Sequence, residues 1–269
     1  MKKFLFTAVI MFVSVILNAA LPPQISIRCG KLDFKLSKFQ SWNLSEINFN
    51  NVNVCRNISY FGNVAMFKIN GKEGWVGSGH KDNDKKGETE LEVHFFADGK
   101  EFTPDKKLCE VKEFELKKSS VLLDLKIEYT LKVKDSEIYE HAKITVLRDN
   151  YVRLLYLFMH PWCPIFTRAD FDLGNGKVKT AELAGKRELV RTPGAMLARY
   201  YAPEQKFVTT TQIKAIKPFY NGENNMFHLW NRGDKHDRKL YFQAVSKKNM
   251  KAGETGEYEA VTKFFISEK

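Results

Sequence analysis

The sequence predicts an all-β protein, a large antiparallel β-sandwich with long twisted strands and few helices. From Val121 to Val133 every odd position is apolar, and every even position except Leu122 is polar. Alternation with period two is typical of a strand with one buried and one solvated face. The 21 Phe and 10 Tyr residues also favour strands. Only the stretch Ala181–Ala184 suggests a helical turn.

The first twenty residues predict a signal peptide rather than part of the fold. Lys2 and Lys3 precede the apolar stretch Phe4–Leu17, and small residues follow as far as Ala20. We expect cleavage near Ala20 and export to the periplasm or the medium, with a retained N-terminal anchor as the alternative. No Pro/Gly/Ser linker divides residues 21–269, which predicts a single β-sandwich domain.

The first half of this domain predicts short strands punctuated by turns. Residues 41–63 are rich in Asn and Ser and predict a loop with edge strands, whereas the pairs Asn70-Gly71 and Asp98-Gly99 predict turns. The expected strands are Ile25–Cys29, Leu32–Leu36, Val64–Ile69 and Glu90–Phe96.

The second half predicts longer strands. Val121–Val133 is followed by two more β-like runs, with the polar pairs Asp135-Ser136 and Asp149-Asn150 between them. We expect these runs to form an antiparallel meander, and residues 161–177 to form a loop. The remaining expected strands are Ile138–Leu147, Tyr151–Trp162, Phe207–Ile216, Leu240–Val245 and Tyr258–Ile266.

The chain is basic, with a formal net charge of +11. Its lysines occur in small groups such as Lys106-Lys107 and Lys247-Lys248, which form either a solvated surface or a surface with affinity for anionic polymers. For an exported protein the expected anionic partner is a glycan. The sequence has no signature of a nucleic-acid-binding module. Membrane contact is expected only through the cleaved signal peptide or surface charge.

The four cysteines are Cys29, Cys55, Cys109 and Cys163. In an oxidising compartment they allow two disulfides, with three possible connectivities. From proximity in the sequence we expect Cys29–Cys55 and Cys109–Cys163. No CxxC pair is present, so neither a redox dithiol nor a Cys-rich zinc site is predicted.

Three residues are candidates for acid/base catalysis. His160 ends an apolar strand and, by alternation, shares a face with Tyr156 and Trp162, where it is either a hydrogen-bonded core residue or a general acid/base. Tyr139 and His141 share a face two residues apart. Such a pair suits proton abstraction in β-elimination, but it is also common as surface decoration.

Candidate ligand-binding residues lie in or beside predicted loops. Partly exposed indoles offer flat apolar surfaces to a sugar ring, although burial in the core is the rival interpretation for each Trp. His80 follows a glycine-rich turn, and Arg168 could neutralise a substrate carboxylate. We expect no cofactor and no metal. The ligand-binding candidates are Trp75, His80, Trp162, Arg168 and Trp230.

The order of three segments resembles the galactose-mutarotase-like β-supersandwich proteins. These segments are Trp75–His80 with the strand after it, the end of the meander at Phe158–Trp162, and Lys251–Tyr258 before the last strand. The resemblance implies a sugar-related role. We therefore expect an exported protein that binds or processes carbohydrate on the concave polar face of a supersandwich. If it is an enzyme, a polysaccharide lyase or an epimerase- or mutarotase-like activity is expected. The alternative is a non-catalytic envelope or accessory protein whose basic surface binds anionic polymers.

Overall fold

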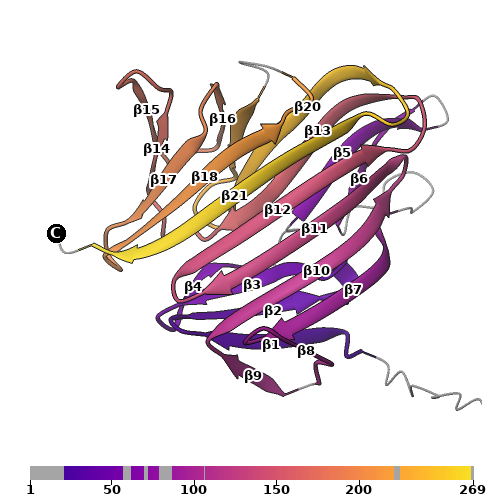
Figure 1. The fold of residues 1–269 in the computed structure, drawn as a ribbon. Helices are drawn as coiled ribbons and strands as arrows, with labels where there is room; N and C mark the ends of the chain where they lie inside the picture. The colour runs from indigo at the N-terminus through magenta and orange to yellow at the C-terminus, as the bar shows by residue number, and fades with distance from the viewer. Residues whose placement is uncertain are drawn as a thin grey trace, which may run out of the picture.

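The computed structural model describes residues 21–56, 62–69, 72–78, 87–105, 107–220 and 225–267. Within these ranges the chain forms strands and one short 3-10 helix, Lys38–Gln40, which confirms the all-β prediction. No helix in the described part is long and apolar enough to cross a membrane. The strands form two stacked sheets (Figure 1).

The front sheet contains the long diagonal strands at the centre of Figure 1. All of its neighbouring strands are antiparallel. Its order is β15 (Val178–Glu182), β14 (Arg168–Asp172), β17 (Leu197–Ala202), β18 (Phe207–Lys217), β21 (Thr255–Ile266), β12 (Glu137–Val146), β11 (Leu125–Lys134), β10 (Glu113–Leu122), β7 (Thr89–Ala97) and β8 (Lys100–Phe102).

The rear sheet packs behind the front one. At one of its edges, β1 and β9 pair in parallel. Its order is β16 (Glu188–Pro193), β19 (Met226–Asn231), β20 (Arg238–Met250), β13 (Asn150–Trp162), β4 (Val52–Cys55), β3 (Asn43–Phe49), β2 (Leu32–Ser37), β1 (Gln24–Cys29) and β9 (Leu108–Val111). In addition, β5 (Gly62–Ile69) pairs with β13, and β6 (Lys72–Gly77) pairs with β5.

The alternation in β11 produces the predicted two faces. Its apolar residues are at most 2% exposed and face the rear sheet, while the polar residues between them lie on the outer face. Burial of such apolar side chains between the two sheets is the main contribution to the stability of the sandwich. The buried set is Leu125, Ile127, Tyr129, Leu131 and Val133.

The run Val121–Val133 is not one strand, so this prediction is wrong in its extent. The chain reverses at Leu123-Asp124, and Leu122 pairs with Leu125 across the hairpin between β10 and β11. Leu123 takes a positive φ of 52°, which is uncommon for a bulky residue. Asp124 holds the turn in place because it accepts hydrogen bonds from Arg148 and Asn150. The alternation continues through the turn, so the periodicity alone does not reveal it.

The predicted meander is also broken between its second and third runs. β12 belongs to the front sheet, whereas β13 crosses to the rear sheet and pairs with β20 and β5. Strand β13 is buried on both faces over Tyr156–Trp162, as expected for a central strand. The connection between the two sheets is therefore residues 147–149, and β13 forms the middle of the rear sheet.

A bulge in β13 changes which face its side chains point to. The pairing with β20 shifts between Leu157 and His160, and Phe158 has a positive φ of 52°. One extra residue in a strand moves every later side chain to the opposite face. Tyr156 consequently points outward, while His160 points into the core toward Glu140 of β12. The predicted common face of Tyr156 and His160 is thus wrong.

Three further expectations are corrected by the structure. Ala181–Ala184 is not helical, because Ala181 lies in β15, and the expected loop 161–177 contains β14. The cysteines form no disulfide: all four are free thiols, and Cys29 donates to the carbonyls of Lys112 and Val133. The predicted turn Asn70-Gly71 lies outside the described residues.

Candidate functional site

The outer face of the rear sheet carries a cavity of about 490 Å³, which we call the rear cavity. It spans six strands, from β16 at the sheet edge through β19, β20 and β13 to β5 and β6. Its lining is mainly aromatic and contains no carboxylate among the described residues. The lining residues are Val64, Trp75, Tyr156, Leu189, Arg191, His228, Trp230, Lys239 and Tyr241.

Strand register explains why these side chains meet. Arg191 pairs with His228, and His228 pairs with Tyr241, so these three form one row across β16, β19 and β20. Two residues along, Leu189, Trp230 and Lys239 form the next row. Residues directly opposite on neighbouring strands share a face, and residues two apart on one strand share it too. Both rows therefore project outward together.

Stacked rings form the floor of the rear cavity. The Trp75 and Tyr156 rings lie 5.7 Å apart at an interplanar angle of only 17°. Tyr241 contacts Tyr156 with ring centroids 4.9 Å apart. Trp230 is 40% exposed, and the Arg232 guanidinium lies 5.6 Å from the centre of its ring. A concave apolar surface with a few polar groups is the usual construction of a small-molecule site.

His228 is the most buried titratable group in this lining, at 6% exposure. Burial, assisted by the nearby positive charge of Arg191, lowers the pKa of His228 to about 4. The imidazole is therefore neutral near pH 7. Its Nδ1 lies 3.3 Å from the Tyr156 hydroxyl, and its Nε2 has no hydrogen-bond partner among the described residues. A neutral imidazole with one unused nitrogen can donate to or accept from a ligand hydroxyl, depending on the tautomer.

Two cations line the rear cavity, and neither forms a salt bridge with a carboxylate in the described part of the chain, although Asp237 attracts Lys239. Arg191 is exposed on the edge strand β16, and Lys239 is only 8% exposed on β20. Burial lowers the pKa of Lys239, because the charged ammonium loses hydration there. The rear cavity thus combines aromatic surface with unbalanced positive charge.

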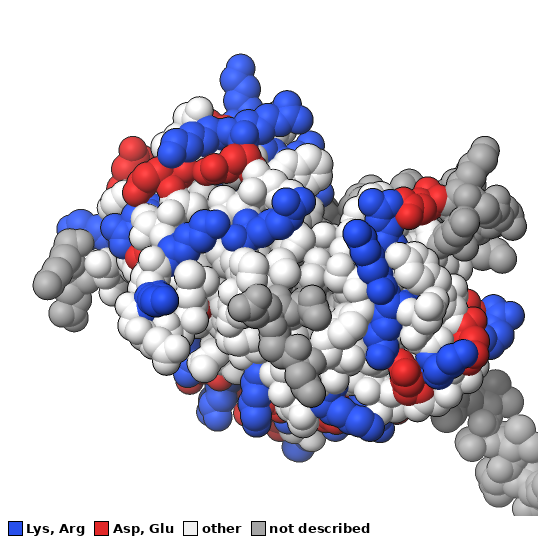
Figure 2. Space-filling view, turned by 90° about the horizontal axis from the view of Figure 1, so that it is seen from above, with Lys and Arg blue, Asp and Glu red and all other residues white. Residues whose placement is uncertain are grey.

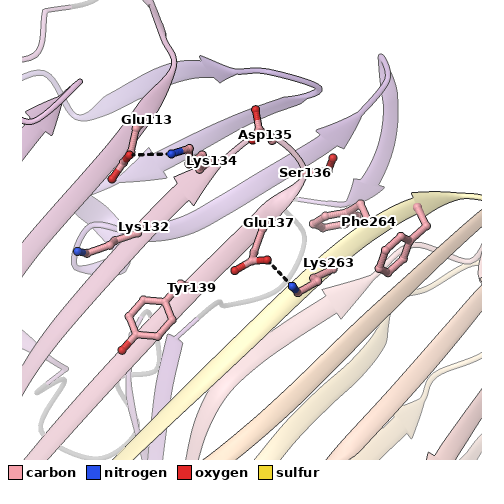
Figure 3. A pocket seen from close by; sticks show the side chains of 10 residues that line it. Glu113, Lys132, Lys134, Asp135, Ser136, Glu137, Tyr139, Lys263 and Phe264 are labelled. Atoms are coloured by element: carbon pink, nitrogen blue, oxygen red, sulfur yellow. Dashed lines mark ion pairs between the residues drawn. The ribbon is translucent and has the colours of Figure 1, made fainter.

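The front sheet carries a second depression of about 490 Å³, which we call the front hollow. It lies at the hairpin between β11 and β12 and beside β21 (Figure 3). Each of its lysines faces a glutamate: Lys134 lies 3.6 Å from Glu113, Lys263 lies 2.7 Å from Glu137, and Lys132 lies 3.3 Å from Glu115. Apart from the ring of Tyr139, its aromatic surface comes from Phe264 and Phe265 of β21.

The structure brings only two of the predicted ligand-binding residues, Trp75 and Trp230, into the rear cavity. His160 and Trp162 lie in the core, at 2% and 0% exposure. His160 Nε2 is 2.7 Å from a Glu140 oxygen, and the Tyr129 hydroxyl donates to the other oxygen at 2.7 Å. This buried group joins β11 and β12 of the front sheet to β13 of the rear sheet, and has no route to a ligand in solution.

The remaining predicted residues lie elsewhere. Tyr139 and His141 are on the outer face of the front sheet, where the Tyr139 hydroxyl donates to Glu259 and His141 contacts Glu257. Burial and the bond to Glu259 raise the pKa of Tyr139 to about 12. Arg168 binds Asp170 and stacks over the Tyr201 ring at 4.2 Å. His80 lies outside the described residues.

The sequence reasoning missed the polar half of the rear cavity. His228 alternates with Phe227 and Leu229, and Tyr241 alternates with Leu240 and Phe242. This alternation on two adjacent strands could have indicated a shared outer face. Arg191 had no such signal, because β16 was not predicted. No group of three or more metal-ligating side chains occurs in the described part of the chain.

No protein-family model matches the sequence, and no curated protein matches it significantly. Solved structures do match. A protein from Synechocystis has a TM-score of 0.60 at 9% identity and covers 99% of this chain and 100% of its own. A galactose mutarotase-like protein from Lactobacillus casei has a TM-score of 0.54 at 9% identity, over 90% of this chain and 100% of its own. A galactose mutarotase related enzyme from Lactobacillus acidophilus has a TM-score of 0.52 at 7% identity, over 91% of this chain and 99% of its own.

These similarities define the fold. The chain has the galactose mutarotase-like β-supersandwich fold, as its segment order indicated. At such low identity the likeness concerns architecture alone, because one fold supports many unrelated activities. Function has to be argued from the rear cavity itself.

Proposed function

We propose that this protein binds carbohydrate in the rear cavity and that it is exported to do so. The observation that carries the proposal is the aromatic floor, where Trp75 stacks on Tyr156 beside the exposed ring of Trp230. Indole and phenol rings pack against the C–H faces of pyranoses, and nearby polar groups bind the hydroxyls. Several solved structures with this fold are named as galactose mutarotase-like proteins, which is consistent with a sugar ligand.

The chemistry of the rear cavity favours binding over acid/base catalysis. Epimerisation or elimination needs a proton acceptor and a proton donor whose pKa values suit neutral pH. The described lining offers no carboxylate, and burial raises the pKa of Tyr156 to about 12. His228 is uncharged near neutral pH, but its pKa of about 4 makes it only a weak base there. If the protein is an enzyme, His228 is the lining residue that should accept the proton.

A titration calorimetry panel of mono- and oligosaccharides tests the proposal. We expect at least one sugar to bind, and Trp75→Ala to weaken its affinity by about tenfold through loss of the stacking surface. Phe39→Ala is the matched control, because Phe39 is 68% exposed on the 3-10 helix away from the cavity. Equal affinity of wild type and Trp75→Ala for every bound sugar would place the site elsewhere.

A non-catalytic envelope protein held by surface charge is the second candidate. The formal net charge of +11 favours it, and Lys and Arg side chains spread across the face seen in Figure 2. Binding through dispersed charge is screened by salt, since the Debye length falls from about 10 Å at 0.1 M to about 3 Å at 1 M. Retention on an anionic polymer that disappears at high salt, with no sugar bound in calorimetry, would support this candidate.

A further inference from the structure

The two hollows differ in charge balance, and this difference bears on the ligand. In the front hollow, Lys134 and Lys263 each face a glutamate. In the rear cavity, neither Arg191 nor Lys239 has a salt bridge within 4 Å to any described residue. Asp237 attracts Lys239, but this carboxylate is itself paired with Arg232 at 3.0 Å. Placing an unpaired ammonium in a largely apolar setting is costly, and an anion supplied by a ligand offsets that cost.

The placement of these cations on the sheet fits a single sugar ring between them. Arg191 is on β16 and Lys239 on β20, with β19 between these strands. Neighbouring strands are about 4.8 Å apart, so the two backbones are separated by about 10 Å across the sheet. His228 and Trp230 of β19 occupy that interval. A ring seated on β19 would have one cation on each side.

A buried polar atom points to the same place. His228 is 6% exposed, and its Nε2 lacks a partner among the described residues although it lines the rear cavity. Buried nitrogen atoms in folded proteins are nearly always hydrogen-bonded, so an unpartnered one in a cavity lining is available to a ligand. His228 lies in the same row as Arg191.

We propose that the rear cavity selects sugars that carry an oxyanion, a carboxylate, sulfate or phosphate group, which Arg191 and Lys239 bind while Trp75 and Trp230 hold the ring. His228 Nε2 bonds a ring hydroxyl beside the anion. A guanidinium presents a planar fork that matches the paired oxygens of all three groups, and such charge-assisted bonds are about twice as strong as neutral ones. This inference rests on the proposed sugar-binding function and specifies its ligand class.

The test is calorimetry of the full chain with four matched hexoses: methyl glucoside, glucuronate, glucose 6-sulfate and glucose 6-phosphate. We expect at least one anionic sugar to bind about tenfold or more tightly than the neutral glucoside. The three anionic sugars distinguish a carboxylate from a sulfate or phosphate ligand. In Arg191→Gln and in Lys239→Met, affinity for the anionic sugar should fall about tenfold more than affinity for the neutral glucoside, so that the preference is lost.

Arg199→Gln is the matched control, because it removes the same charge from β17 of the front sheet. It should keep the full preference. Equal affinity for neutral and anionic hexoses, or a preference that survives both Arg191→Gln and Lys239→Met, would overturn this inference alone. Failure of every hexose and oligosaccharide to bind would overturn the proposed function as well. Circular dichroism melting confirms that each variant is folded before its affinity is compared.

Discussion

The front hollow and the rear cavity have the same volume, about 490 Å³, but differ in chemistry. Each lysine of the front hollow forms an ion pair with a glutamate of the protein, so none is left for a ligand anion. The rear cavity has stacked rings, an imidazole nitrogen without a partner among the described residues, and two cations that form no salt bridge with them. The comparison teaches that volume alone does not identify a binding site, whereas unsatisfied polar groups beside exposed aromatic surface do.

The largest loss of stability should come from a substitution in the core, outside both the front hollow and the rear cavity. His160→Leu removes one partner of the buried Glu140 and should lower the free energy of unfolding by about 3–5 kcal/mol. Urea denaturation of wild type and variant measures this loss. The double variant Glu140→Leu/His160→Leu should recover part of it, because no charge then stays unpaired. Unchanged stability combined with lost sugar affinity would instead restore His160 as a site residue.

A smaller change in stability, dependent on pH, should come from the protonation of His228 in the rear cavity. Its pKa is lowered from 6.5 to about 4, so between these values the unfolded chain binds a proton that the native state does not. The stability contributed by the neutral imidazole is full above pH 6.5 and is lost as the pH falls toward 4. We expect His228→Gln to reduce this acid-induced loss in the free energy of unfolding, by on the order of 2–3 kcal/mol near pH 4.

His94 on the front sheet has a pKa shift in the opposite direction, so its contribution to stability depends on pH in the opposite way. Glu101 and Glu92 raise its pKa above 6.5, so its contribution is present below that pH and lost as the pH rises through the folded pKa. Solvent screening keeps this contribution small, since the side chain is 39% exposed. Melting temperatures recorded from pH 7 to pH 4 compare His228→Gln with the wild type. A steeper acid decline in His228→Gln than in wild type would contradict the buried neutral imidazole.

The smallest effect is expected in the front hollow. Lys263→Gln breaks the pair with Glu137, whose side chains are 49% and 43% exposed. Exposed pairs contribute about 0.2–1 kcal/mol, so the melting temperature should change little and sugar affinity not at all. Calorimetry with the tightest-binding hexose checks the second part. A tenfold loss of affinity in this variant would reverse the assignment of the two regions.

Much of the architecture was predictable from consecutive residues. The expected strands Ile25–Cys29, Leu32–Leu36 and Phe207–Ile216 correspond to β1, β2 and β18, and the turns at Asp98 and Asp135 occur where polar residues adopt positive φ. Period-two alternation is a local property, which is why it reports the strand and its buried face reliably.

The site was predictable only in part, for a physical reason that β13 illustrates. Trp75 and Trp230 were candidate ligand-binding indoles, with core burial as the alternative, and both line the rear cavity. His160 was placed on the face of Tyr156 by counting residues, but the bulge at Phe158 turned it inward to Glu140. A bulge is set by how two neighbouring strands fit together, and this fit is not visible in either strand alone.

The sequence by itself determined that the chain forms strands with one buried and one solvated face, because each residue's neighbours fix that pattern. Only the tertiary structure decided that β13 crosses to the rear sheet and that Arg191 of β16 lines the same cavity as Lys239 of β20. Those outcomes depend on burial of apolar surface between segments far apart in the chain, a cooperative contribution to the free energy that no local pattern encodes.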